Sequence, residues 1–136
     1  MSELLSSLNW LSIIIATLFY FVLGALWYSP VLFGNIWMKL RNLDPETMER
    51  PNPIIYLYSF ILQLIGVISL ALFITALGVD GAGNGSLIGF GAGAGFVFSL
   101  AGATGIFTGV PVKLHFLDNG YHAVGLALAG LVLGWW

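Results

Sequence analysis

The run IIYLYSFILQLIGVISLALFITAL, residues 54–77, contains no charged side chain and decides the fold of this chain. Roughly 18 or more consecutive apolar residues are enough for a helix to cross the hydrocarbon core of a bilayer. Three further uncharged stretches of comparable length cover residues 4–38, 81–112 and 119–136. The sequence therefore predicts four membrane-spanning helices.

The overall composition supports a membrane protein and argues against several classes of function. Of the 136 residues, 59% are hydrophobic and 7% are charged, whereas an ordinary soluble domain has roughly 25% charged residues. Four Lys and Arg residues against six Asp and Glu residues give no basic surface for nucleic acid. The chain has no cysteine, which rules out thiol nucleophiles and cysteine-ligated metals. We expect the lipid bilayer as a partner and no cofactor.

Glycine, proline and charged residues limit the four spans, because they break helices or belong outside the hydrocarbon core. The expected spans are about residues 10–28, 54–77, 86–108 and 116–136. Residues 1–136 thus form a single transmembrane domain. The predicted fold class is all-α: an integral membrane four-helix bundle with a short interfacial helix after the first span.

That interfacial helix is expected at about residues 31–40, directly after the helix-ending pair Ser29-Pro30. Its apolar side chains recur at helical spacings, and basic residues flank them, as in helices that lie in the membrane surface. The apolar stripe consists of Leu32, Phe33, Ile36, Trp37 and Leu40.

The basic residues are distributed asymmetrically between the loops. Lys39, Arg41 and Arg50 lie between the first two spans, and Lys113 lies between the last two. An excess of Lys and Arg in short loops marks the cytoplasmic side. The sequence predicts a cytoplasmic loop over 29–53, both termini outside, and a cytoplasmic (inner) membrane as the location.

Residues around the end of the first span carry a resemblance to a known family. The stretch GALWYSPVLFGNIW, residues 24–37, and the later Asn119-Gly120-Tyr121 leading into Gly130 resemble domain-of-unknown-function family 1761. The resemblance covers nearly the whole chain and implies a small protein with four spans, but it implies no reaction. Its signature residues are Trp27, Tyr28, Ser29, Pro30, Phe33, Gly34 and Trp37.

The first two spans each carry one polar face. At about 100° per residue, the members of each set fall within about 80° of arc. These sets are Thr17, Tyr20, Gly24 and Tyr28 on the first helix, and Tyr56, Ser59, Gln63 and Gly66 on the second. Such faces either line a path for a small molecule or form helix–helix contacts through small residues and hydroxyls. We favour the contacts, and we expect the Gln63 amide to find a partner inside the bundle.

The third span is rich in glycine on two opposite sides. Small residues allow helices to pack closely in lipid, where no hydrophobic effect drives helices together. We expect one side to pack within the chain and the other to meet a second protomer or to border a cavity. The expected packing positions are Gly89 and Gly93 on one side, Gly91, Gly95 and Gly102 on the other, and Gly24, Gly66, Gly130 and Gly134 on the remaining spans.

The start of the fourth span holds the strongest chemical candidate. In a helix, His115, Asp118, Asn119 and His122 would share one face of about 100°. Such a group could relay protons, bind a metal or contact a ligand through Asn119 and His122. However, Asp118-Asn119-Gly120 also resembles a turn. We therefore interpret Asp118 and Asn119 as a helix cap.

Three functions remain open on the sequence alone. The first is a small oligomeric, non-enzymatic membrane protein that binds or passes a small apolar or neutral solute. The second is a structural or accessory subunit that packs with lipids or a larger membrane partner. The third and weakest is a membrane metal or enzyme site at His115, Asp118 and His122. We favour the first, with a homo-oligomer as the expected assembly.

Reporter fusions test the orientation. A phosphatase that is active only outside the cytoplasm should be active when it follows Trp136, and a fluorescent protein that matures only inside should be dark there. Adding several lysines to residues 78–85 should disturb insertion, because it erases the charge asymmetry between the loops. Cytoplasmic activity of reporters at both termini would contradict the orientation.

Overall fold

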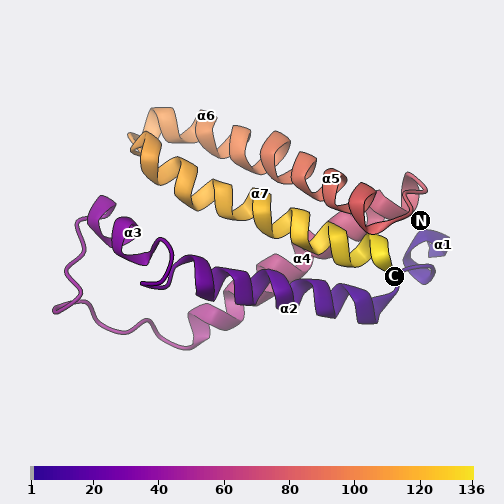
Figure 1. The fold of residues 1–136 in the computed structure, drawn as a ribbon, viewed down its shortest axis with the longest axis horizontal. Coiled ribbons are helices and arrows are strands. Elements are labelled where there is room, and N and C mark those ends of the chain that lie inside the picture. The colour runs from indigo at the N-terminus through magenta and orange to yellow at the C-terminus, as the bar shows by residue number, and fades with distance from the viewer. Residues whose placement is uncertain (1) are drawn as a thin grey trace.

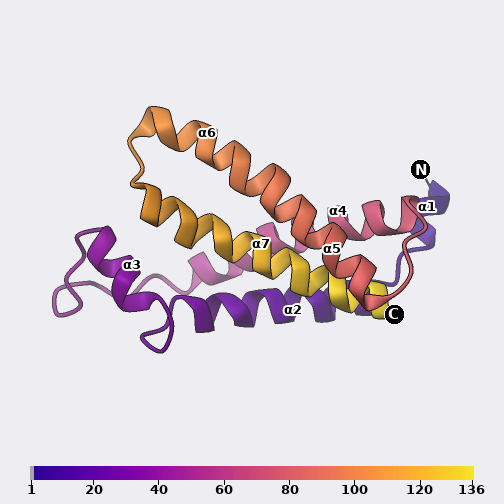
Figure 2. The same ribbon diagram turned by 45° about the horizontal axis from the view of Figure 1, so that its top comes forward.

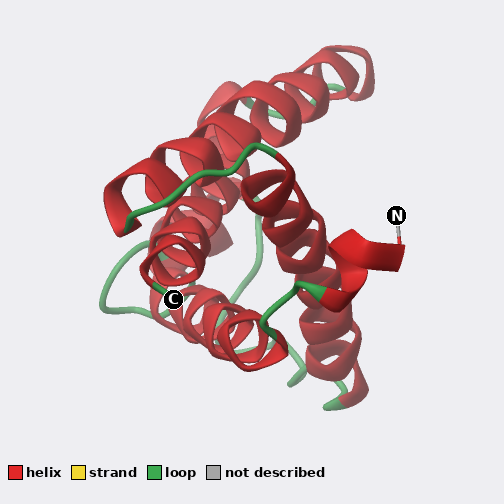
Figure 3. Ribbon diagram, turned by 90° about the vertical axis from the view of Figure 1, so that its right-hand side faces the viewer, coloured by secondary structure: helices red, strands yellow, loops and turns green. Residues whose placement is uncertain are grey.

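The computed structural model describes residues 2–136, in which helix is the only regular secondary structure (Figure 3). The elements are α1 (Ser2–Ser6), α2 (Trp10–Trp27), α3 (Gly34–Leu40), α4 (Ile54–Ala76), α5 (Ala82–Ala92), the π-helical segment η1 (Gly93–Phe98), α6 (Ser99–Thr108) and α7 (Val112–Trp135). Within residues 2–136, four helices are long and apolar enough to span a membrane: α2, α4, the continuous α5–η1–α6, and α7. The chain is thus an all-α integral membrane protein, which confirms the predicted fold class.

Both termini lie at one end of the molecule, and α3 lies at the other (Figure 1). The turn between α6 and α7 is at the same end as α3. The central helix is α7, which contacts α2, α3, α4, α5, η1 and α6. The apolar core gathers around it and includes Ile13 and Tyr20 of α2, Val67 and Leu70 of α4, and Leu126.

The last two spans begin earlier in the chain than expected. The third begins at Ala82 rather than near 86, directly after Gly81, whose φ of 91° suits glycine. Gly109, with a φ of 72°, ends α6, and Pro111 precedes the first residue of α7. The fourth span therefore begins at Val112 rather than near 116, which places Asp118 and Asn119 in its second turn and not at its start.

The interfacial helix is shorter than expected, because the chain turns before it. The predicted range was 31–40, but α3 begins at Gly34. The amide of Gly34 donates to the carbonyl of Ser29 at 2.9 Å. A Cβ at Gly34 would lie only 2.7 Å from the Ser29 carbonyl carbon, so the turn requires glycine. The sequence did not predict α1.

Glycines bring α5 and α7 into direct backbone contact. An added Cβ at Gly85 or Gly89 would overlap the backbone of Gly130 or Leu126, and a Cβ at Gly93 would lie 2.5 Å from the Cα of Ala123. Gly85, Gly89 and Gly93 are spaced four residues apart, so they lie along one edge of the third span. Close approach of this kind is how small residues hold helices together in lipid.

The other glycine positions differ from one another. Gly24 faces the ring of Tyr121, Gly134 faces the backbone of Gly81, and Gly102 faces the ring of His115. By contrast, an added Cβ at Gly66, Gly91 or Gly95 would meet no atom of the described chain within 4 Å beyond the adjacent backbone of its own helix. Gly66, a predicted packing position, thus meets no neighbouring helix of the described chain, because α4 presents Val67 and Leu70 to the core.

The third span leaves α7 as it continues from α5 into α6. Figure 2 shows α6 leaning away from α7 toward the end that carries α3. Contacts with α7 are extensive along α5 and η1 and sparse along α6. The outer side chains of α6 are correspondingly exposed, with Ile106 at 81% and Phe107 at 92%. In a membrane this apolar surface faces lipid or another protein.

Substitutions at Gly93 and Gly95 should separate packing within the chain from contacts outside it. Gly93→Leu should destabilise the folded chain by about 3 kcal/mol or more, because the side chain has to displace the α7 backbone. Gly95→Leu is the matched control two residues away, and we expect the monomer to keep its melting temperature. Thermal unfolding of both variants in one detergent measures this, and an equal loss would contradict the α5–α7 contact.

Candidate functional site

The polar residues of α7 form the candidate site. Asp118, Tyr121 and His122 lie at spacings of three and four, so a continuous helix places them on one face. Asp118 and Asn119 therefore do not cap a helix, and that interpretation is wrong. The reason lies upstream, because Pro111 fixes the start of α7 and leaves these residues in its second turn.

The carboxylate of Asp118 joins three parts of the chain. Its Oδ1 accepts hydrogen bonds from the Tyr28 hydroxyl at 2.9 Å and from the Trp37 indole nitrogen at 3.0 Å. Tyr28 directly follows α2, and Trp37 belongs to α3. Hydrogen bonds to a charged acceptor are stronger than neutral ones. Asp118 thus holds the end of α2 and the interfacial helix against α7.

The residues of the family signature build the turn that makes this contact possible. The Trp27 indole nitrogen donates to the carbonyl of Leu117 at 3.1 Å, and its ring packs on Phe33 with centroids 4.7 Å apart. The Ser29 hydroxyl donates back to the carbonyl of Leu26 at 2.7 Å. The signature therefore has a structural explanation: it directs Tyr28 and Trp37 toward one carboxylate.

Tyr121 lies at the centre of the site and is only 4% exposed. Its hydroxyl accepts from the amide nitrogen of Gln63 at 2.8 Å and donates to the backbone carbonyl of Tyr20 at 3.2 Å. The ring also packs edge-on against Tyr28, with centroids 5.6 Å apart. The amide oxygen of Gln63 is buried and has no hydrogen-bond partner in the described chain.

The two histidines point to different partners. His122 Nδ1 lies 2.6 Å from the Tyr20 hydroxyl, while His115 Nδ1 lies 2.9 Å from the Asn119 amide nitrogen. The ring of His115 packs on the ring of Phe98 and does not turn toward Asp118 or His122 as a shared metal site would need. Across residues 2–136, no three His, Asp or Glu side chains converge as a metal site would require. The weak metal candidate at His115, Asp118 and His122 is not assembled.

A cavity of about 540 Å³ lies between α2 and α4, and we refer to it as the α2–α4 cavity. Its polar wall is made of three tyrosines, one serine and one glutamine, and the remainder is apolar or glycine. The lining residues are Phe21, Gly24, Ala25, Tyr28, Tyr56, Ser59, Gln63 and Tyr121. No charged side chain borders it, so the cavity suits a neutral molecule.

Half of the predicted binding residues line this cavity, namely Tyr28, Tyr56, Ser59 and Gln63. The others lie elsewhere. Thr17 is fully buried and donates to the carbonyl of its own helix at Ile13, Tyr20 bonds to His122, and Asn119 bonds to His115. A polar face on a helical wheel does not distinguish hydroxyls that bond to their own backbone from those that face a cavity.

Tyr121 is the residue that sequence reasoning missed. The cost of burying Gln63 predicted a partner inside the bundle, but nothing in the pattern indicated which helix would supply it. Only the placement of α7 beside both α2 and α4 brings the Tyr121 hydroxyl within 2.8 Å of Gln63.

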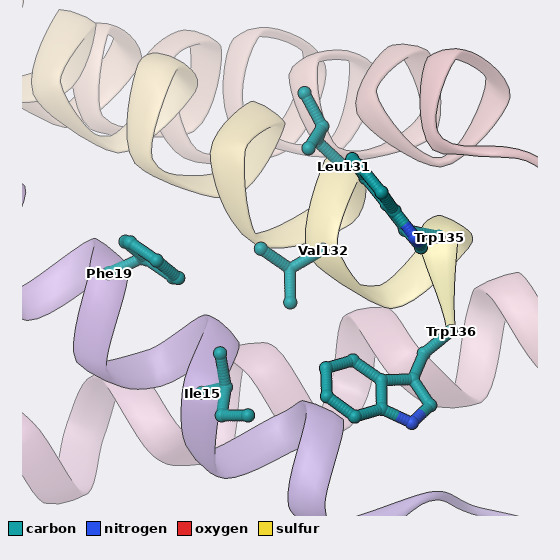
Figure 4. Close-up of a pocket in the computed structure, with 6 residues that line it drawn as sticks. All are labelled: Ile15, Phe19, Leu131, Val132, Trp135 and Trp136. Carbon is teal, nitrogen blue, oxygen red and sulfur yellow. The ribbon is translucent and has the colours of Figure 1, made fainter.

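A second hollow, of about 480 Å³, lies between α2 and α7 near the chain termini (Figure 4). It is lined by Ile15, Phe19, Leu131, Val132, Trp135 and Trp136. Several of these side chains are open to the outside, with Phe19 at 52% and Trp135 at 78%. This apolar, open groove suits a lipid chain and offers no specific polar contact beyond the indole nitrogens.

The sequence model of a known family, described as "Protein of unknown function (DUF1761)", matches residues 11–134. This match confirms the resemblance inferred from residues 24–37. Searches of curated proteins and of solved structures gave no match.

Substitutions at Asp118 test its structural role. Asp118→Ala removes the acceptor for Tyr28 and Trp37 and should destabilise the fold by about 2–3 kcal/mol. Asp118→Asn keeps an oxygen for both donors and should have less than half that effect. Thermal unfolding in one detergent measures both variants, with Asp80→Ala as a control in the loop between α4 and α5. Equal losses for Ala and Asn would show that the hydrogen bonds do not matter.

Proposed function

The chain belongs to the family of proteins of unknown function DUF1761, and we propose that this membrane protein binds or passes a small, neutral, largely apolar solute. The observation that carries the proposal is the α2–α4 cavity of about 540 Å³. Ligand pockets of roughly 300–1,000 Å³ accept molecules the size of metabolites or drugs. No residue is assigned a catalytic role.

The lining of the α2–α4 cavity supports a neutral ligand. Aromatic rings from Phe21, Tyr28 and Tyr56 offer apolar surface, while Ser59 and Gln63 offer polar atoms. Burying an unpaired charge in such a site is far more costly than burying a neutral group. The cavity therefore favours an apolar body with few polar groups.

Gln63 indicates one of those polar groups. Its amide nitrogen is engaged with Tyr121, whereas its amide oxygen is buried without a partner. An unsatisfied buried acceptor costs about 1–3 kcal/mol. A ligand hydroxyl or amide N–H would satisfy that oxygen once the Gln63 side chain turns toward the cavity. We therefore propose a ligand with at least one hydrogen-bond donor.

A homo-oligomer is part of the proposal. Gly91 and Gly95 have open space where the described chain supplies no neighbour within 4 Å, and small-residue faces commonly mediate helix association in lipid. The same face also suits the alternative function, an accessory subunit packed against a larger membrane partner. A changed oligomeric state of Gly95→Leu with an unchanged fold would support the homo-oligomer.

The proposed location is the cytoplasmic membrane, with residues 29–53 inside the cell and both termini outside. Lys39, Arg41 and Arg50 lie in that loop, and Lys113 follows the other turn at the same end of the molecule. Their common placement agrees with the usual enrichment of basic residues on the cytoplasmic side.

Single cysteines can test the cavity, because the native chain has none. A small neutral maleimide should modify Ser59→Cys in nanodiscs, and 2-naphthol should slow the reaction by occupying the α2–α4 cavity. Naphthalene, which lacks the hydroxyl donor, should protect about fivefold less well, as expected for the loss of one neutral hydrogen bond.

Two controls accompany this measurement. Ser69→Cys lies on an exposed part of α4, so 2-naphthol should not protect it. Adding Gln63→Leu to Ser59→Cys should reduce protection by 2-naphthol to the level given by naphthalene. A Ser59→Cys variant that never reacts, or that neither compound protects, would contradict solute binding and favour the accessory role.

A further inference from the structure

A further pocket, which shares only Tyr28 with the α2–α4 cavity, lies where α3 covers α7, and we call it the Asp118 pocket. Its volume is about 460 Å³, and its walls include Tyr28, Trp37, Met38, Met48, Asp118 and His122. We infer that the Asp118 pocket binds a small organic ammonium group, either of a free amine or of a lipid headgroup.

The carboxylate of Asp118 brings a negative charge to the pocket. Both groups that donate to its Oδ1, the Tyr28 hydroxyl and the Trp37 indole, are neutral. They orient the carboxylate without balancing its charge. A partly buried carboxylate is stabilised by a cation in its surroundings. The pocket wall thus presents a negative charge that two neutral donors hold in position, and neither donor is a cation.

The wall around that charge is rich in aromatic rings and sulfur atoms. Two aromatic side chains, Tyr28 and Trp37, and two thioethers, Met38 and Met48, line the pocket together with Gly34 and His122. Aromatic faces attract weakly hydrated cations, and quaternary ammonium groups are commonly bound in this way. Thioethers add polarizable apolar surface that suits methyl or methylene groups on the cation.

The same lining disfavours a hard metal ion. Calcium takes six to eight oxygen ligands and magnesium prefers an octahedron of oxygens, whereas Asp118 is the one carboxylate among the lining residues. The remaining walls supply rings and sulfur atoms. An organic cation needs a single counter-charge and a large apolar contact surface, which this pocket has.

Trp37 already holds a cation in the structure. The guanidinium carbon of Arg41 lies 5.1 Å from the centre of the Trp37 ring, which shows that the indole can accept a cation on its face. Arg41 itself is not among the residues that line the pocket. Its removal should therefore leave the binding of an ammonium ligand intact.

Choline and its uncharged isostere 3,3-dimethylbutan-1-ol provide a matched pair of probes. Calorimetric titration of the full chain in maltoside micelles should show that choline binds, with an affinity at least about tenfold above that of the alcohol. Asp118→Asn should abolish that preference, while Asp80→Asn should keep it. Equal binding of the two probes to the wild type, or no choline binding, would overturn the inference.

A second variant keeps the test valid if Asp118→Asn folds poorly. Met48 lies in a loop and is 43% exposed, so Met48→Lys should leave the fold intact while placing a cation in the pocket. It should weaken choline binding more than the neutral Met48→Gln does. Unchanged choline binding in Met48→Lys would overturn the assignment to this pocket.

Lysophosphatidylcholine distinguishes the source of the ammonium group. If a lipid headgroup is the natural ligand, adding this lipid to the micelles should compete with choline for the wild-type protein. If a free amine is the ligand, choline affinity should not change. Gln63→Leu should leave choline binding unaffected in either case, which separates this inference from the proposed solute site in the α2–α4 cavity.

Discussion

The close approach of α5 to α7 is the constraint on which the remaining structure depends. Gly85, Gly89 and Gly93 leave no room for a Cβ against the α7 backbone. In lipid the helices gain little from apolar burial, so van der Waals contact at short range has to hold them together. Such a close contact also fixes the rotation of α7 about its own axis. One side of α7 is committed to α5, and the other is left for α2, α3 and α4.

That rotation determines where the polar groups of the chain can be satisfied. Asp118, Tyr121 and His122 face away from α5, and each finds a partner on another element. Since unpaired polar groups are costly in a membrane, these hydrogen bonds select the arrangement of α2, α3 and α4 around α7. The glycines allow α5 and α7 to approach closely, and the polar face of α7 determines which elements pack on its other side.

The sequence predicted the spans and the fold class because uncharged length is a direct physical requirement for crossing a bilayer. It predicted a fourth span from about residue 116 but interpreted Asp118 and Asn119 as a helix cap, because Asp-Asn-Gly reads locally as a turn. The turn at Gly109 and Pro111 overrode that local preference.

The sequence predicted only part of the candidate site, for a related reason. Helical periodicity placed Tyr56, Ser59 and Gln63 on one face, and these do line the α2–α4 cavity. Thr17 satisfied the same pattern yet bonds to its own backbone. Which face meets a cavity depends on helix rotation, and that rotation is set by contacts between residues far apart in the chain, such as Tyr20 with His122.

Tyr28 is the residue that both pockets share. Its ring forms part of the α2–α4 cavity and of the Asp118 pocket, and its hydroxyl is held by Asp118. The hydrogen bond to Asp118 restrains the orientation of a ring that lines both spaces. A cation that draws the Asp118 carboxylate toward itself weakens that anchor and gives the ring more freedom. Any influence of one pocket on the other therefore has a direct physical route through this hydrogen bond, with no movement of the helices required.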